Sequence, residues 1–249
     1  MPLNTAARAA QQGHRWRAMG LTALALIGTG VVMCARADDR PFLRTTHAMA
    51  SEDEDGWEVS STWVGNRQGH AMSVQLERDL TSSQRLELEW GNASRVDAPE
   101  PEQGLRLRSL WISPRDRGFG LATKLGIEPG SGEAGQRKQA LAVASVPFMD
   151  DRLWIHANTG WQWQRRTDEV PARASVSTLA MHYGWTPQRW LYAEGTRTSD
   201  GRDRLFHAGV RQWLMHNKLA LDTGWGRQSG AERRGDFLAV NLSWFDLND

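Results

Sequence analysis

His156 and Asn158 stand two positions apart, so in a β-strand both side chains would lie on the same face. A histidine there could act as a general base, but no serine nucleophile accompanies it in the same stretch. The chain has neither a G-x-S-x-G nor an H-E-x-x-H motif, and no histidine is followed by serine two positions later. Clustered metal-ligand spacing is absent too, and Asp150-Asp151 lies in a predicted tight turn. We therefore predict no catalytic residue, no bound metal and no cofactor, and expect that the protein is not an enzyme.

Charged and polar side chains occupy every second position in several parts of the chain. Glu87 and Glu89, for example, oppose Leu86 and Leu88, which is the alternation of a strand with one polar and one apolar face. The residues on these polar faces are Glu87, Glu89, Arg106, Arg108, Lys124, His156, Asn158, His182, Glu194, His207, Arg211 and Asp222. Because both signs of charge are present, we expect ion pairs between them rather than a single-sign ion filter.

Two roles are open for these residues. They could brace and solvate the interior of the fold, which is common for paired charges, or they could contact a ligand directly. The first candidates for ligand contacts are Glu194, Arg211, Arg106 and Arg108.

The elements that must position these side chains are strands. Alternation predicts strands over residues 57–64, 70–78, 85–92, 104–112, 118–127, 138–147, 153–164, 174–185, 189–197, 204–214, 218–227 and 236–245. Two of them, 138–147 and 189–197, alternate poorly, so the sequence does not settle their registers.

The connections between these strands differ in length in a regular way. After the second strand, tight turns such as "TSSQ", "MDD" and "HN" alternate along the chain with longer polar loops such as "ASRVDAPEPEQ" and "EPGSGEAGQR". In an up-and-down meander every second connection lies at the same end, so the tight turns gather at one end and the loops at the other. Outer-membrane barrels have this asymmetry, with short periplasmic turns and longer extracellular loops.

Strand length and tryptophan content favour a sheet that spans a membrane. The strands run about 8–12 residues, close to the number that crosses a bilayer at a tilt. The chain has 13 Trp against 2 Tyr, and indole settles at the membrane–water boundary. The tryptophans near strand ends are Trp63, Trp90, Trp111, Trp163, Trp185, Trp190, Trp225 and Trp244.

A soluble sandwich would show the same alternation, but strand length and tryptophan placement favour the membrane-spanning sheet. Lipid offers no hydrogen-bond partners to unpaired backbone groups, so a spanning sheet must close on itself. We therefore predict an all-β fold, a closed antiparallel up-and-down transmembrane β-barrel of about 12 strands. The polar faces then line its lumen.

The first 37 residues have the layout of a secretory signal peptide. A basic start precedes a mostly apolar stretch over 21–33, and Ala35-Arg36-Ala37 gives an A-x-A cleavage signal. A lipoprotein signal at Cys34 is the alternative, but Met33 is large where such signals have a small residue. Without the leader's four arginines, 26 basic residues face 29 acidic ones, a net charge of −3. This balance gives no support to nucleic-acid binding.

Residues 38–56 form an acidic segment that ends in "SEDEDG", and residues 57–249 form the predicted barrel domain. We expect the segment to be solvated in the periplasm. The alternative is that it reaches into the lumen as a small plug.

Three short stretches at the start of this region resemble an outer-membrane family named for the meta-pathway of phenol degradation, whose members are usually described as transporters. The stretches are Arg40-Pro41-Phe42, Thr45-Thr46-His47-Ala48 and Gly56-Trp57-Glu58. Thr46-His47 stands where the family has an acidic pair.

Later stretches, "HANTGW", "YAEG" and "HAGVRQWL", are similar to the family's later strands, with Asn158, Gly160, Glu194, Gly209 and Arg211 at matching positions. The resemblance spans most of residues 40–245. It implies a barrel that passes small molecules, aromatic or apolar ones among them.

These observations predict an outer-membrane channel of a Gram-negative bacterium for passive passage of small solutes. Its expected partners are outer-membrane lipid, the solute and, during biogenesis, the barrel-assembly machinery. One alternative is a non-conducting structural or interaction barrel of the envelope, which inward-facing Trp154 and Trp213 would favour by filling the lumen. A second is a soluble periplasmic β-protein.

Overall fold

The computed structural model describes residues 41–49, 56–67, 69–93, 104–129, 135–165, 172–201, 203–230, 234–245 and 247. All of them belong to one unit, Cys34–Asp249. The predicted signal peptide, residues 1–37, and the acidic run 51–55 lie outside the described residues. Within the described ranges, no helix is long and apolar enough to cross a membrane.

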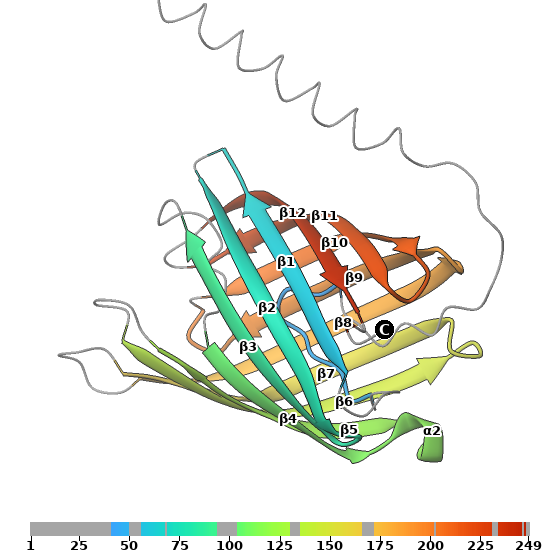
Figure 1. Ribbon diagram of the computed structural model, residues 1–249. Helices are drawn as coiled ribbons and strands as arrows, with labels where there is room; N and C mark the ends of the chain where they lie inside the picture. Colours follow the sequence, from blue (N-terminus) through green and yellow to red (C-terminus); the bar gives the residue numbers. More distant parts are fainter. Residues whose placement is uncertain are drawn as a thin grey trace, which may run out of the picture. The chain divides into compact units, whose positions relative to one another are not determined.

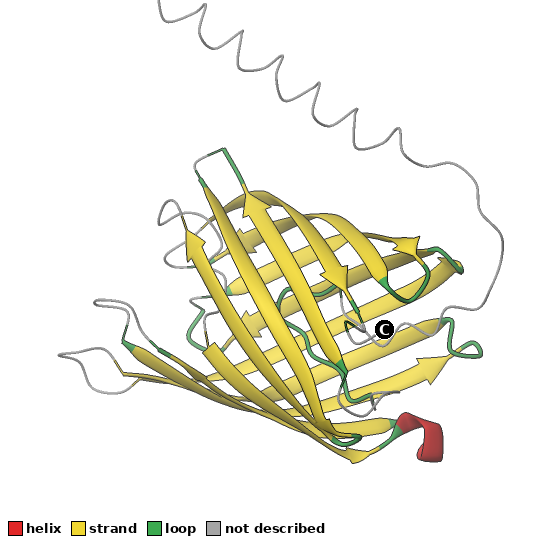
Figure 2. Cartoon of the chain, viewed as in Figure 1, coloured by secondary structure: helices red, strands yellow, loops and turns green. Residues whose placement is uncertain are grey.

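The described residues form twelve strands and one helical turn, α2 (Pro114–Arg117) (Figures 1 and 2). The strands are β1 (Trp57–Gly65), β2 (His70–Thr81), β3 (Gln84–Ala93), β4 (Gly104–Ile112), β5 (Gly120–Glu128), β6 (Gln136–Phe148), β7 (Leu153–Arg165), β8 (Ala172–Thr186), β9 (Arg189–Thr198), β10 (Arg204–Met215), β11 (Leu219–Ser229) and β12 (Arg234–Trp244). Each strand pairs antiparallel with the next, and β12 returns to pair with β1. The predicted closed up-and-down barrel is confirmed.

The two ends of the barrel differ as the sequence predicts. One end, here called the turn end, carries the connections 82–83, 113–119, 149–152, 187–188 and 216–218. The opposite loop end carries 66–69, 94–103, 129–135, 166–171, 199–203 and 230–233.

The connection 113–119 is longer than the tight turn expected there. Ser113 caps α2 by accepting from the Arg115 N–H, and Gly118 closes the turn in the left-handed region at φ 71°.

The two strands with poor alternation, β6 and β9, carry large side chains on both faces. The inward positions of β6 include Leu141 and Val143, which are buried against Ala48 of the N-terminal segment. Those of β9 include Trp190 and Tyr192, both buried. Alternation fails in these strands because part of the lumen is filled by apolar and aromatic groups rather than by polar ones.

The outer face is an apolar belt with tryptophans toward its edges. Leu88, Leu125, Leu179 and Leu238 are each at least half exposed. The exposed tryptophans are Trp90, Trp111, Trp161, Trp163, Trp185, Trp225 and Trp244. Trp190 does not belong to this set, which corrects the expectation for that residue. It faces inward because it shares its strand face with Glu194.

A charge reversal in this belt tests whether its surroundings are lipid. Leu179 lies at the middle of β8 on the outer face. In a lipid bilayer, Leu179→Arg should lower the free energy of unfolding by about 2–4 kcal/mol, and Ser175→Arg, near the loop end, by about 0–1 kcal/mol. Denaturant titration in phospholipid vesicles measures both. Equal, small effects of the two substitutions would show that the outer face is not buried in hydrocarbon.

Candidate functional site

A segment from before the first strand lies inside the barrel. This inner segment, residues 41–49, is drawn in blue within the ring of strands in Figure 1. Thr45, Thr46, His47 and Ala48 are all buried. A Cβ on Gly120 of β5 would lie 1.9 Å from the Ala48 carbonyl oxygen, so only glycine permits this approach. Residues 41–49 of the predicted periplasmic segment, 38–56, thus lie inside the barrel, where the plug alternative would place them.

The carboxylate of Glu194 holds the start of the inner segment. Its Oε1 accepts from the Leu43 N–H at 2.6 Å, and its Oε2 accepts from the N–H groups of Arg44 at 3.1 Å and Thr45 at 3.2 Å. The Thr45 hydroxyl adds a fourth bond to Oε2 at 3.2 Å. His207 Nδ1 lies 3.3 Å from Oε1 on the wall side. A buried carboxylate is costly unless its lone pairs are satisfied, and here backbone donors of the inner segment satisfy them.

Asn158 and Ser145 hold the second half of the segment. Oriented to pair with Thr46, the Asn158 amide donates to the Thr46 carbonyl at 2.9 Å and accepts from its N–H at 2.8 Å. The Ser145 hydroxyl accepts from the Ala48 N–H at 2.8 Å. The two wall residues therefore bind backbone groups of the inner segment rather than its side chains.

Ser145 also lies 2.8 Å from Nδ1 of His156, whose Nε2 lies 3.3 Å from Nδ1 of His182. No serine stands in the same strand as His156, and Ser145 comes from the neighbouring strand β6, so the sequence alone did not reveal this contact. Its hydroxyl is fully buried beneath the inner segment and already accepts from Ala48, so it is positioned to anchor the segment. In the described part of the chain, no group of three or more His, Cys, Asp or Glu side chains is placed to hold a metal ion.

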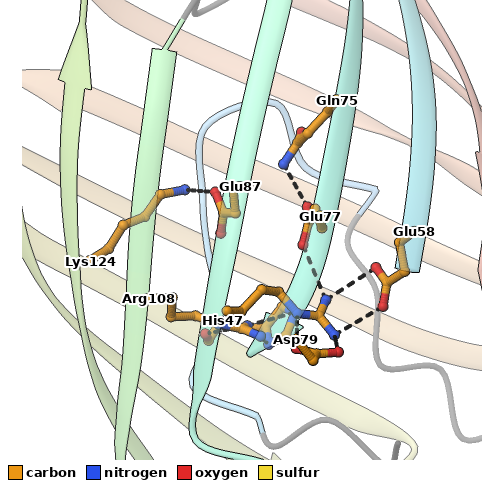
Figure 3. Close-up of polar contacts among 9 residues, drawn as sticks. His47, Glu58, Gln75, Glu77, Asp79, Glu87, Arg108 and Lys124 are labelled. Carbon is orange, nitrogen blue, oxygen red and sulfur yellow. Dashed lines mark hydrogen bonds and ion pairs between the residues drawn. The ribbon is translucent and has the colours of Figure 1, made fainter. Parts of the chain in front are cut away.

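Ion pairs cross the lumen face of β3, β4 and β5. Lys124 Nζ lies 2.8 Å from Glu87 Oε2, and Arg106 Nη1 lies 2.9 Å from Glu89 Oε2 (Figure 3 draws the first pair). Arg108 Nη1 instead lies 2.9 Å from His47 Nδ1 and donates to the His47 carbonyl at 3.1 Å. Arg108 is thus a fourth wall residue that contacts the inner segment.

A second set of charges lies on β10 and β11. Arg211 binds Asp222 through two parallel hydrogen bonds, of 2.7 Å from Nε and 2.8 Å from Nη2. Asn241 donates to the same carboxylate at 3.0 Å. The Arg211 guanidinium also lies 5.5 Å from the ring centroids of Trp213 and Phe245. This pair is therefore satisfied within the wall, without the inner segment.

Arg85 gathers three carboxylates near the turn end. It binds Asp79 through Nε at 2.6 Å and Nη2 at 2.7 Å, Glu77 through Nη1 at 3.1 Å, and Glu58 through Nη2 at 2.9 Å. Figure 3 shows these carboxylates turned toward one point, with Gln75 beside Glu77. From the sequence, Arg85 is expected only as the first residue of the strand 85–92. Its position two residues before Glu87 was the available signal, since residues two apart share a face.

An aromatic layer lies in the lumen near the turn end. Trp190, Trp213 and Phe245 pack together in one buried cluster, and Trp154 is buried beside His156 with its ring nearly parallel to the imidazole. The inward orientation expected to favour a filled barrel is therefore present for both Trp154 and Trp213.

A small cavity of about 50 Å³ remains between the inner segment and the wall of β1, β2 and β12. Its lining is apolar on the segment side and polar on the wall side: Pro41, Phe42, Leu43, Glu58, Val59, Ser60, Thr62, Gln75, Glu77, Asn241, Ser243 and Phe245. None of the predicted lumen residues lines it. All ten, however, are buried in the interior: Arg106, Arg108, Lys124, His156, Asn158, His182, Glu194, His207, Arg211 and Asp222. That any of them contacts a solute stays a prediction.

No family model matches the sequence, and no curated protein matches it. Solved structures are similar in fold. The NanC porin aligns with a TM-score of 0.61 at 7% identity, covering 76% of this chain and 98% of its own. The KdgM porin aligns with a TM-score of 0.59 at 12% identity, covering 75% of this chain and 98% of its own. An outer membrane channel from Pseudomonas putida F1 aligns with a TM-score of 0.57 at 10% identity, covering 79% of this chain and 97% of its own. The chain therefore shares its fold with outer-membrane porins and channels.

The Glu194 contacts make a prediction about access to the inner segment. Thr46 is fully buried, and the chain's one cysteine lies in the predicted leader, so Thr46→Cys gives a single reporter thiol. Adding Glu194→Ala removes the acceptor of four hydrogen bonds. At about 1 kcal/mol each, their loss should raise the rate of maleimide labelling at position 46 at least about tenfold.

The matched control is Thr196→Ala, at the next inward position of β9. It should leave the labelling rate within about twofold, since a substitution that breaks no such contact has a small effect. Similar rates in all three proteins would contradict the assignment of Glu194 as the residue that holds the segment.

Proposed function

We propose that this protein is an outer-membrane channel whose lumen is narrowed by its own inner segment, leaving one side path for small solutes. The observation that carries the proposal is the cavity between the inner segment and β1, β2 and β12. The inner segment, the ion pairs and the aromatic layer occupy other parts of the described lumen.

Placement in the outer membrane is supported by the outer face. A closed barrel with an exposed apolar belt and tryptophans near its edges fits a bilayer and would be an aggregation hazard in water. The shared fold with outer-membrane porins points the same way. The turn end then faces the periplasm and the loop end faces outward.

The chemistry of the path favours small solutes with an apolar body and a hydrogen-bonding group. On the segment side, Phe42 and Leu43 offer apolar contact, while on the wall side Ser60, Thr62 and Asn241 offer hydroxyl and amide groups. A phenol-like molecule matches both sides. This agrees with the resemblance to a family named for phenol degradation.

The alternative is a non-conducting barrel with a structural or interaction role. The aromatic layer favours it, because Trp154, Trp190, Trp213 and Phe245 occupy the lumen near the periplasmic end. The two functions differ in one observable, which is whether ions pass through the inserted protein.

Phe42→Ala tests the side path. The Phe42 ring lines the cavity and contacts His156, His182 and Tyr192. Its removal should enlarge the cavity, so single-channel conductance in a planar bilayer should rise about twofold or more.

Phe206→Ala is the control, since Phe206 is half exposed on the outer face. It should leave the conductance unchanged. Discrete steps in the parent protein that Phe42→Ala does not alter would place the path elsewhere, and an absence of steps in all three proteins would establish the non-conducting alternative.

The charge of the path gives a second prediction. Glu58 and Glu77 line the cavity, and no basic side chain is among the described residues that line it. Small cations should therefore be preferred over anions. Glu58→Gln should shift the reversal potential in a salt gradient toward zero, by about 10 mV or more if this carboxylate sets the preference.

Asp236→Asn removes a carboxylate that is exposed on the outer face, and it should leave the reversal potential unchanged. An anion-selective parent protein would refute the assigned path.

A further inference from the structure

Basic side chains gather on the outer face of the barrel at its loop end. On each strand from β6 to β12, the outward position nearest the loops, or the next one, is arginine or lysine. The residues of this basic belt are Lys138, Arg165, Arg173, Arg197, Arg204, Arg227 and Arg234, and all seven are exposed. They continue the outward alternation of apolar residues such as Leu179, Phe206 and Leu238. The belt therefore lies directly beyond the apolar belt, at the level of lipid headgroups.

Register places like charges beside one another in this belt. Arg197 of β9 is the direct partner of Arg204 of β10. Like charges that face each other across a strand pair are destabilising unless an anion lies between them. Among the outward strand residues at this level, the structure describes one carboxylate, Asp236, which lies 3.7 Å from Arg227. The strand residues alone thus leave an excess of positive charge.

Arg173 links the basic belt to the aromatic edge of the apolar belt. Its guanidinium carbon lies 4.9 Å from the Trp161 ring centroid and 5.8 Å from that of Trp163. An arginine stacked on indole keeps its N–H groups at the ring edge, where they can bind a planar or tetrahedral anion.

The turn end has a different composition. There the exposed arginines Arg78, Arg115, Arg117 and Arg152 stand near the exposed acids Asp116, Asp150 and Asp151. The excess of positive charge on the described outer face is therefore a property of the loop end rather than of both rims.

We propose that the basic belt binds the phosphate groups of the outer-leaflet glycolipid, lipid A. Phosphate takes several charge-assisted hydrogen bonds from arginine forks, and the Arg197–Arg204 pair offers two adjacent forks at headgroup level. Acyl chains of the same lipid would lie along the apolar belt below. This inference rests on the proposed placement in the outer membrane and goes beyond channel function.

The test measures lipid binding to the folded protein in detergent by native mass spectrometry. The probes are bis-phosphorylated lipid A and the same lipid with both phosphates removed. The variant R197Q/R204Q is compared with the control R78Q/R152Q. The control changes two exposed arginines toward the turn end, Arg78 on β2 and Arg152 in the connection between β6 and β7. R197K/R204K keeps the charge but removes the fork, and R173Q tests a single member of the belt.

We expect the parent protein to bind the phosphorylated lipid about tenfold more tightly than the dephosphorylated one. R197Q/R204Q should lose that preference, R197K/R204K should keep part of it, and R78Q/R152Q should keep all of it. Folding of each variant is checked by its heat-modifiable mobility on a gel.

Equal binding of the two lipids by the folded parent protein overturns the inference, as does an equal loss in R78Q/R152Q. A barrel that inserts into vesicles but ignores the phosphates overturns only this inference. A chain that stays folded and soluble without detergent overturns the proposed outer-membrane placement itself.

Discussion

The closure of β12 onto β1 is the constraint on which the rest of the structure depends. Their register runs from Val59 opposite Trp244 to Gly65 opposite Leu238 and removes the free edges that a twelve-stranded sheet would otherwise have. Once the sheet is closed, each strand has one face outside and one inside a space of fixed size. Every inward side chain must then fit that space and find partners within it, because few groups there can reach bulk water.

The inner segment follows from this requirement. Ion pairs such as Arg211–Asp222 and Lys124–Glu87 join wall residues to one another. Glu194 and Asn158 differ, since most partners of their oxygen and amide groups are backbone groups of residues 43–46. A buried charge without partners costs several kcal/mol, so the wall and the segment stabilise each other. Two matching positions of the family resemblance, Glu194 and Asn158, lie at this contact.

Sequence alone could predict the strands, their connections and most inward residues, because alternation with period two follows from strand geometry. It misplaced Trp190 and left the registers of β6 and β9 open, because those strands carry apolar groups on the inside as well. The reason lies in a segment far away in sequence: Leu141 and Val143 pack against Ala48, and no local pattern records that contact. The sequence did not predict the cavity, for a similar reason. Ser60, Thr62 and Ser243 are unremarkable in the sequence and become a lining only because larger groups fill the rest of the lumen.

The position of the cavity follows from an asymmetry in the size of inward side chains. Beside the cavity, β1 and β12 present short groups, Ser60, Thr62 and Ser243 among them, whereas β7, β9 and β10 present His156, Tyr192 and Arg211. The inner segment is held on the side of the long groups, because the hydrogen-bonding atoms that reach its backbone are there. Free space is therefore left on the side of the short groups. In the proposed channel, the placement of the inner segment would set the width of the path, and the strand number would only limit how wide that path can become.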